Sequence, residues 1–182
     1  SHYSLLDGLS KVPDMVKRCK ENGMNALAIT DHGNMYAAIE FYKEAHKAGI
    51  KSIIGVEAYI AERGRKDKEP GVDNKRYHLT LLARTKQGYK NLMRLVTIAN
   101  LEGYYYKPRM DKEILREFSE GIICLSGCMG SQLSQAVLAD NLEKAEDLIK
   151  EHQEIFGKEN YFLEVHAHPH IENDKKLRDG II

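Results

Sequence analysis

The sequence predicts an α/β fold, in which helices alternate with strands that lie parallel in one sheet. Short apolar runs alternate about five times with stretches of helical periodicity, and few hairpin signals separate the runs. No glycine-rich dinucleotide or phosphate-binding motif follows a strand, so a barrel, or part of one, is favoured over a Rossmann fold. The strands are predicted at residues 26–29, 50–60, 77–83, 121–126 and 161–165.

Each predicted helix has its own start or stop signal. Ser10 is expected to cap a helix that runs to about Asn22, with Pro13 tolerated in its first turn. Residues 34–48 form the clearest amphipathic pattern, and Gly49 stands where such a helix ends. Further helices are predicted at residues 86–99, after the capping residue Asp111, at 131–138 and 141–156, and near the end of the chain.

Two connecting segments are rich in polar or aromatic residues. Residues 62–76 mix basic and acidic side chains around Pro70-Gly71, which predicts a solvated loop rather than a contact with nucleic acid. Residues 101–109 hold three consecutive tyrosines beside Lys107 and Arg109. Such residues can stack on bases, but they more commonly pack a loop against the body of a protein.

The composition narrows the class of protein. Lys plus Arg and Asp plus Glu are both 27, so there is no global attraction to nucleic acid. No apolar run approaches the roughly 20 residues of a membrane span, and no secretory signal opens the chain. The three cysteines are too few for a disulfide framework, which indicates a cytoplasmic protein. The chain opens on Ser1 without a methionine, which indicates a piece of a longer protein.

The sequence is organised around Ala-Ile-Thr-Asp-His-Gly at residues 28–33, where an apolar run ends in an acid, an imidazole and a glycine. In parallel α/β folds, ligands gather at the carboxyl ends of strands. Similar groups mark other predicted strands. His78 is the exception, because it begins its strand and reaches the site only if that strand returns beside the Glu57 strand. The candidate residues are Asp31, His32, Glu57, His78, Cys128 and His168.

Each of these groups also has a structural interpretation. Asp31 can cap a helix or stabilise a turn, as can Asp7, and Cys128 can be a small buried hydrophobe. Glu57 can pair with a lysine, and His78 can be a half-buried histidine with satisfied hydrogen bonds. Taken together, carboxylates, imidazoles and a thiolate suit zinc or a similar metal. Metals in such a site can hold a phosphate and lower the pKa of a bound water, which suits phosphoester hydrolysis.

Six segments occur in an order that closely resembles the polymerase and histidinol phosphatase (PHP) domain, in the version at the N-terminus of the bacterial DNA polymerase III alpha subunit. The resemblance covers nearly the whole chain. The segments are Ser-His-Tyr-Ser-Leu-Leu-Asp-Gly, Ile-Thr-Asp-His-Gly-Asn, Gly-Val-Glu-Ala-Tyr, His-Leu-Thr-Leu-Leu-Ala, Lys-Pro-Arg-Met-Asp and Leu-Ser-Gly-Cys.

The resemblance implies a distorted (β/α)7 TIM-like barrel, truncated here at both ends, with a divalent metal at one mouth. Zinc is expected, with manganese and magnesium as alternatives. Asp31 and His32 are the implied catalytic pair, with Asp31 orienting His32. His166 and His170 are expected on the surface. The implied metal ligands are Asp7, His32, Glu57, His78, Cys128 and His168.

The family also places a His-x-His pair before the segment that starts at Ser1 and an Asp-x-His motif after the end of this chain. Residues 1–182 are therefore predicted to be a PHP segment without polymerase palm, fingers or thumb, and to be inactive alone. In the whole protein the resemblance implies DNA replication and a metal-dependent 3′–5′ exonuclease. The implied partners are DNA, the rest of the alpha subunit and other polymerase III holoenzyme subunits. The alternatives are a stand-alone histidinol-phosphatase-like phosphoesterase and a non-catalytic docking module.

Overall fold

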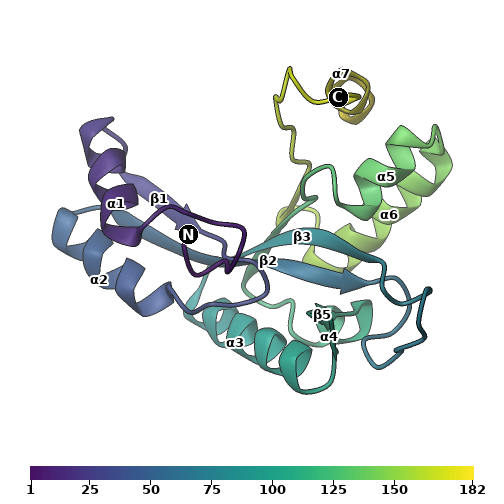
Figure 1. Cartoon of the computed structure of the whole chain (residues 1–182), viewed down its shortest axis with the longest axis horizontal. Coiled ribbons are helices and arrows are strands. Elements are labelled where there is room, and N and C mark those ends of the chain that lie inside the picture. The colour runs from purple at the N-terminus through teal and green to yellow at the C-terminus, as the bar shows by residue number, and fades with distance from the viewer.

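The computed structural model describes every residue of the chain and contains seven strands and seven helices (Figure 1). The strands are β1 (Ala26–Ile29), β2 (Lys51–Ala61), β3 (Arg76–Ala83), β4 (Tyr104–Tyr105), β5 (Lys107–Met110), β6 (Ile122–Leu125) and β7 (Tyr161–Phe162). The helices are α1 (Val12–Glu21), α2 (Ala38–Ala48), α3 (Lys86–Leu101), α4 (Lys112–Glu117), α5 (Gln132–Leu138), α6 (Leu142–Phe156) and α7 (Asp174–Ile181).

The seven strands form one mixed sheet in the order β4-β5-β2-β3-β6-β7, and β1 pairs with β2 outside this path. β1 and β5 run parallel to β2, whereas β3 is antiparallel to both β2 and β6. The α/β class is confirmed, but the prediction of a parallel sheet is wrong. The reason is that a loop rather than a crossover helix joins β2 to β3, so the chain returns in the opposite direction. The sheet is open between β4 and β7, and its closure into a barrel stays a prediction.

Several predicted boundaries shift because side chains make local contacts that periodicity does not show. α1 is preceded by Lys11, without a side-chain cap, so the predicted cap at Ser10 is wrong. α2 begins at Ala38 rather than near Asn34, whose amide donates to the Tyr3 carbonyl at 3.1 Å and accepts from the Tyr36 amide. The cap at Asp111 is confirmed, since its carboxylate accepts from the Ile114 amide at 3.2 Å.

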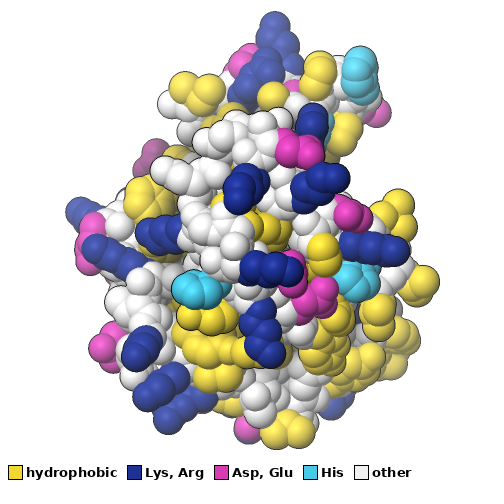
Figure 2. Space-filling model, turned by 90° about the vertical axis from the view of Figure 1, so that its left-hand side faces the viewer, with side chains coloured by type: hydrophobic (Ala, Val, Ile, Leu, Met, Phe, Trp, Pro, Cys, Tyr) yellow, Lys and Arg dark blue, Asp and Glu magenta, His cyan; other side chains and the backbone are white.

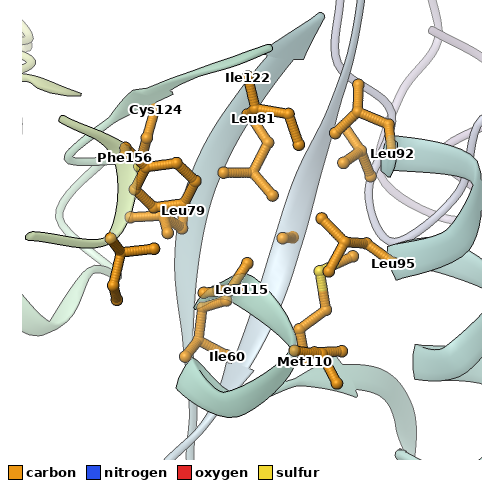
Figure 3. Packing of buried hydrophobic residues seen from close by; sticks show 14 of the residues in the cluster. Ile60, Leu79, Leu81, Leu92, Leu95, Met110, Leu115, Ile122, Cys124 and Phe156 are labelled. Atoms are coloured by element: carbon orange, nitrogen blue, oxygen red, sulfur yellow. The ribbon is translucent and has the colours of Figure 1, made fainter. Parts of the chain in front are cut away.

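The main core lies on one face of the β2–β3 pair. Alternate residues of the two strands, including Val56, Ile60 and Leu81, point to this face because side chains alternate along a strand. Leu92 and Leu95 of α3 cover them, and Figure 3 shows these side chains converging between the strands and the helices. Burial of each such side chain stabilises the fold by about 1.5–3 kcal/mol.

Two smaller cores flank this centre. Phe41 of α2 packs with Val12 and Val16 of α1 on the β1 side of the sheet, at the left of Figure 1. Leu148 of α6 packs with residues of α5 and with Leu177 of α7 on the other side. The sheet is thus held from both ends, and the stretch of β2 and β3 between them carries the polar residues of the candidate site on its second face.

The loop at residues 62–76 is more ordered than the sequence predicts. Arg65 and Asp73 are buried, and Arg65 forms an ion pair with Asp111 at 3.0 Å. The Arg109 guanidinium is fully buried beneath the loop. It donates only to backbone carbonyls, those of Gly103, Asp73, Arg65 and Asp67. Most of the loop is solvent-exposed, as predicted, but the sequence does not show its two buried anchors, because the partner arginine lies more than 30 residues away along the chain.

On the face drawn in Figure 2, basic and acidic side chains are interspersed among apolar ones, with more basic than acidic groups in view. The chain as a whole has a formal net charge of zero. None of the helices combines the length and apolar character that a bilayer crossing requires. The three cysteines are free thiols, with Cys19 and Cys124 buried in the cores.

Candidate metal centre

Three side chains from separate segments converge on the second face of the sheet. His32, Glu57 and His78 each offer a ligand atom, and these atoms all lie within 4.8 Å of one another. The Glu57 Oε1 atom lies 2.9 Å from His78 Nδ1 and 3.5 Å from His32 Nε2. All three side chains are partly exposed, so a ligand can reach them. The prediction that His78 reaches the site if its strand returns beside Glu57 is confirmed, because His78 lies opposite Tyr59 in the antiparallel register.

The turn after β1 brings His32 to this point. The Glu57 amide donates to the Asp31 carbonyl, and the Gly33 amide donates to the Glu57 carbonyl. These two hydrogen bonds form a parallel bridge between His32 and Glu57, which extends the pairing with β2 past the end of β1. Gly33 then adopts a φ of 66°, in the left-handed region that favours glycine. A Cβ atom at Gly33 would lie 2.9 Å from Pro108 Cγ and 3.0 Å from the Tyr59 ring. Glycine therefore allows both the turn and the close packing that hold the imidazole in place.

Cys128 adjoins the same cluster from the loop after β6. Its sulfur lies 3.6 Å from His78 Nδ1 and 4.0 Å from Glu57 Oε1. The His78 amide donates to the Gly130 carbonyl, which ties this loop to the start of β3. Gly127 has a φ of 84°, and a Cβ there would lie 2.7 Å from the His78 carbonyl oxygen. The loop can approach His78 only because this position has no side chain.

The electrostatic environment favours the charged forms of two of these groups. The hydrogen bonds of His78 with Cys128 and with Glu57 raise the pKa of the imidazole to about 9. Burial alone would raise the pKa of Glu57, but its hydrogen bond with His78 and the nearby His32 and His166 lower it overall. The carboxylate is thus anionic at neutral pH, and it attracts cations to the cluster.

Asp7 contacts the cluster from the first turn of the chain. Its Oδ2 atom lies 3.2 Å from His32 Nε2, and its side chain is 61% exposed. Successive contacts therefore link five residues from five separate segments, namely Asp7, His32, Glu57, His78 and Cys128.

Asp31 faces away from the three imidazole and carboxylate groups. Its buried carboxylate accepts hydrogen bonds from the Ser1 and Ser4 hydroxyls. The Ser4 hydroxyl also accepts from the His32 amide at 3.1 Å. The Asp31 carboxylate thus contacts the His32 amide through Ser4, a buried residue that the motif contains but that sequence reasoning did not single out.

His168 does not touch the three-residue cluster. Its Nε2 atom lies 3.3 Å from His166 Nδ1, and His166 Nε2 lies 2.7 Å from Glu164 Oε1. His166 is half-buried rather than a plain surface residue, whereas His168 and His170 are exposed. The role of His168 as a ligand stays a prediction, since its contact with His166 does not continue to the three-residue cluster.

The donor set fits a divalent cation. Two ligand atoms on a tetrahedral zinc ion lie about 3.3 Å apart when each bond is about 2.05 Å long. The separations of 2.9 Å and 3.5 Å around Glu57 Oε1 bracket that value. Imidazole nitrogens with a carboxylate and a nearby thiol are ligands that zinc accepts, and manganese accepts the nitrogen and oxygen atoms as well.

The chain belongs to the PHP domain family, whose model matches residues 1–168. Its curated relatives include DNA polymerase III alpha subunits. It is 48% identical to that of Thermus aquaticus, over 92% of this chain and 14% of the relative. It is 46% identical to that of Borreliella burgdorferi, over 92% of this chain and 15% of the relative. The Treponema pallidum subunit is 44% identical over the whole of this chain and 16% of its own length. The chain thus spans about a seventh of the length of these relatives.

A solved structure shares the fold at low sequence identity. It belongs to a candidate metal-dependent phosphoesterase from Bifidobacterium adolescentis, and the match has a TM-score of 0.53 with 13% identity. It covers 96% of this chain and 78% of that one. At this identity the likeness establishes the fold alone.

Proposed function

We propose that this chain is the PHP domain of a bacterial DNA polymerase III alpha subunit and that its metal centre hydrolyses phosphodiester bonds as a 3′–5′ exonuclease. The observation that carries the proposal is the convergence of His32, Glu57 and His78 within 4.8 Å. The identity of 44–48% to polymerase alpha subunits supports the context of DNA replication.

The residues of the chain have distinct proposed roles. His32, Glu57 and His78 hold the cation, which is proposed to be zinc, while Asp7 and Cys128 complete its surroundings. A divalent ion held there would supply Lewis-acid activation of water and phosphate. Asp31 and Ser4 are positioning residues that fix the His32 backbone. His168 is proposed to contribute from outside this set, through its contact with His166.

The proposed context follows from the polymerase relatives. Residues 1–182 would form a PHP unit within a longer alpha chain in the bacterial cytoplasm. The partners would be DNA, the rest of that chain and other subunits of the replicative holoenzyme. We further propose that the open sheet is part of a distorted β/α barrel, in which β3 would run opposite to its neighbours.

The test is replacement of His32 by Ala in the full chain. We expect zinc per chain and the release of nucleotides from a labelled 3′ end to fall together, because the imidazole is proposed to bind the metal. His46→Ala is the matched control, since His46 is an exposed histidine on α2. Full zinc occupancy with full activity in the His32 variant would refute the proposal. Metal binding without any 3′-end hydrolysis in the unmodified protein would favour the non-catalytic docking module.

A further inference from the structure

Two cations beside the metal centre have no carboxylate within ion-pair distance. Arg76 and Lys107 are both half-buried, and neither forms a salt bridge. The Arg76 guanidinium makes one hydrogen bond, to the Asn74 carbonyl. Other shielded cations have partners: Arg65 contacts Asp111, Lys112 contacts Glu151, and Arg109 donates to four backbone carbonyls. Arg76 and Lys107 have neither a carboxylate partner nor a set of carbonyl acceptors like that of Arg109.

The sheet register brings both cations to the face that carries the metal centre. Tyr59 of β2 lies opposite His78 of β3, and Arg76 is two residues before His78 on the same strand. Tyr59 also lies beside Arg109 of β5, and Lys107 is two residues before Arg109. Because side chains alternate along a strand, all of these residues share one face.

Tyr59 links the cations to the metal centre. The Arg76 Cζ atom and the Lys107 Nζ atom each lie 5.7 Å from the centre of the Tyr59 ring. The same ring lies 5.4 Å from the His78 ring and 6.1 Å from the His32 ring. The cations therefore lie immediately beyond the metal ligands, separated from them by one aromatic side chain.

This arrangement is suited to an anion rather than to stability. Arg76, Lys107 and the buried Arg109 bring like charges together over neighbouring strands, and like charges repel when partly shielded from water. The Tyr59 ring offers only a weak cation–π attraction. A bound phosphate would relieve the repulsion and supply the anionic oxygens that both side chains lack as partners.

We propose that Arg76 and Lys107 form a phosphate clamp that holds the phosphate adjacent to the scissile one in a polynucleotide strand. This inference rests on the proposed function, because the metal centre must hold the scissile phosphate. The clamp would make the site select substrates that carry at least two phosphates, and would disfavour small phosphomonoesters. The choice of substrate would then depend on Arg76 and Lys107, which do not bind the metal.

The test measures binding to the zinc-loaded full chain by titration calorimetry. The probes are a thymidine dinucleotide with a 5′-phosphate (pTpT), which has two phosphates, and thymidine monophosphate, which has one. We expect the unmodified protein to bind pTpT about tenfold more tightly than the monophosphate. Arg76→Gln and Lys107→Gln should each bring that ratio close to one, and Lys107→Arg should retain most of it. Zinc per chain should stay unchanged in all three variants.

Lys68→Gln is the matched control, because Lys68 is an exposed, unpaired cation of the neighbouring loop and its replacement makes the same change in net charge. A ratio that stays at the unmodified value in both Gln variants would overturn the clamp, as would a ratio near one in the unmodified protein. Loss of zinc in the Gln variants would also overturn the clamp, because it would show that Arg76 and Lys107 support the metal centre. Failure of the proposed function gives a different result, in which His32→Ala keeps its zinc and its 3′-end hydrolysis.

Discussion

Two polar clusters lie on the same sheet and use similar residue types, but they are built differently. The arginine network consists of Arg65, Asp111 and Arg109 beneath the loop at residues 62–76, where the Arg65 and Asp111 side chains are each 9% exposed and Arg109 is fully buried. In the metal centre, the side chains of His32, Glu57 and His78 are 20–28% exposed.

The difference lies in how completely the polar atoms are paired. Each nitrogen of the Arg109 guanidinium donates to a backbone carbonyl, in four hydrogen bonds altogether, and the side chain is fully buried. In the metal centre, one oxygen of Glu57 is the common neighbour of two imidazoles and a thiol. Donor atoms that crowd around one point open to solvent indicate a place for a cation, whereas complete pairing indicates a structural role.

The largest expected effect of a substitution is on the arginine network. Arg109→Ala would remove the side-chain donor from the carbonyl oxygens of Asp73, Arg65 and Asp67, so we expect the free energy of unfolding to fall by about 3–4 kcal/mol. Urea denaturation followed by circular dichroism measures this change. Lys68→Ala, in the exposed part of the same loop, should change stability by less than about 0.5 kcal/mol. A loss below about 1 kcal/mol for Arg109→Ala would show that water replaces the guanidinium and that the network is not structural.

The next largest effect is the gain in stability on zinc addition, which should depend on the metal centre and not on the arginine network. Zinc at about 100 times its dissociation constant should stabilise the unmodified chain by about 2.7 kcal/mol, because it binds the folded state only. Arg65→Gln should lower stability without metal yet keep the zinc-dependent gain, whereas His78→Ala should lose that gain. Thermal unfolding with and without zinc is the measurement. An equal zinc-dependent gain in the His78 variant would place the metal elsewhere.

A smaller effect is expected at Ser4, which joins Asp31 to the His32 backbone. Ser4→Ala should weaken zinc binding by about tenfold and lower stability by about 1–2 kcal/mol, because Asp31 loses a buried donor. Competition with a zinc chelator measures the affinity. Ser10→Ala, at an exposed serine, should change neither quantity. Unchanged zinc affinity in the Ser4 variant would mean that the His32 position is set by the turn alone.

The smallest effect concerns His152, a buried histidine that has no part in the metal centre. Its ring stacks on Tyr161 at 5.3 Å, and burial lowers its pKa below 6.5. The unfolded chain therefore takes up a proton more readily than the folded one, so stability should decrease as the pH falls below 6.5 toward the lower folded-state pKa. His152→Gln should flatten this part of the stability profile, while His46→Gln should not. An unchanged slope in the His152 variant would assign the acid sensitivity to other groups.

Much of the local structure, and the chemical types of the residues at the site, could be predicted from the amino-acid sequence. Apolar periodicity located β1, α3 and α6 within a few residues, and the motif segments identified the PHP family. His32 and Glu57 were recognisable because they interrupt or end apolar runs. These signals are local: they depend on spacing along the chain and on the side chain itself.

Which distant groups meet could be seen only in the folded chain. The antiparallel return of β3 brings His78 to Glu57, and the same pairing places Arg76 beside Tyr59. Arg109 could not be recognised as the donor that orders the loop, because its acceptors are carbonyls that any residue carries. Strand direction and backbone pairing depend on long-range packing, which a single sequence does not display. Periodicity and turn chemistry depend on neighbouring residues, so they can be predicted from the sequence.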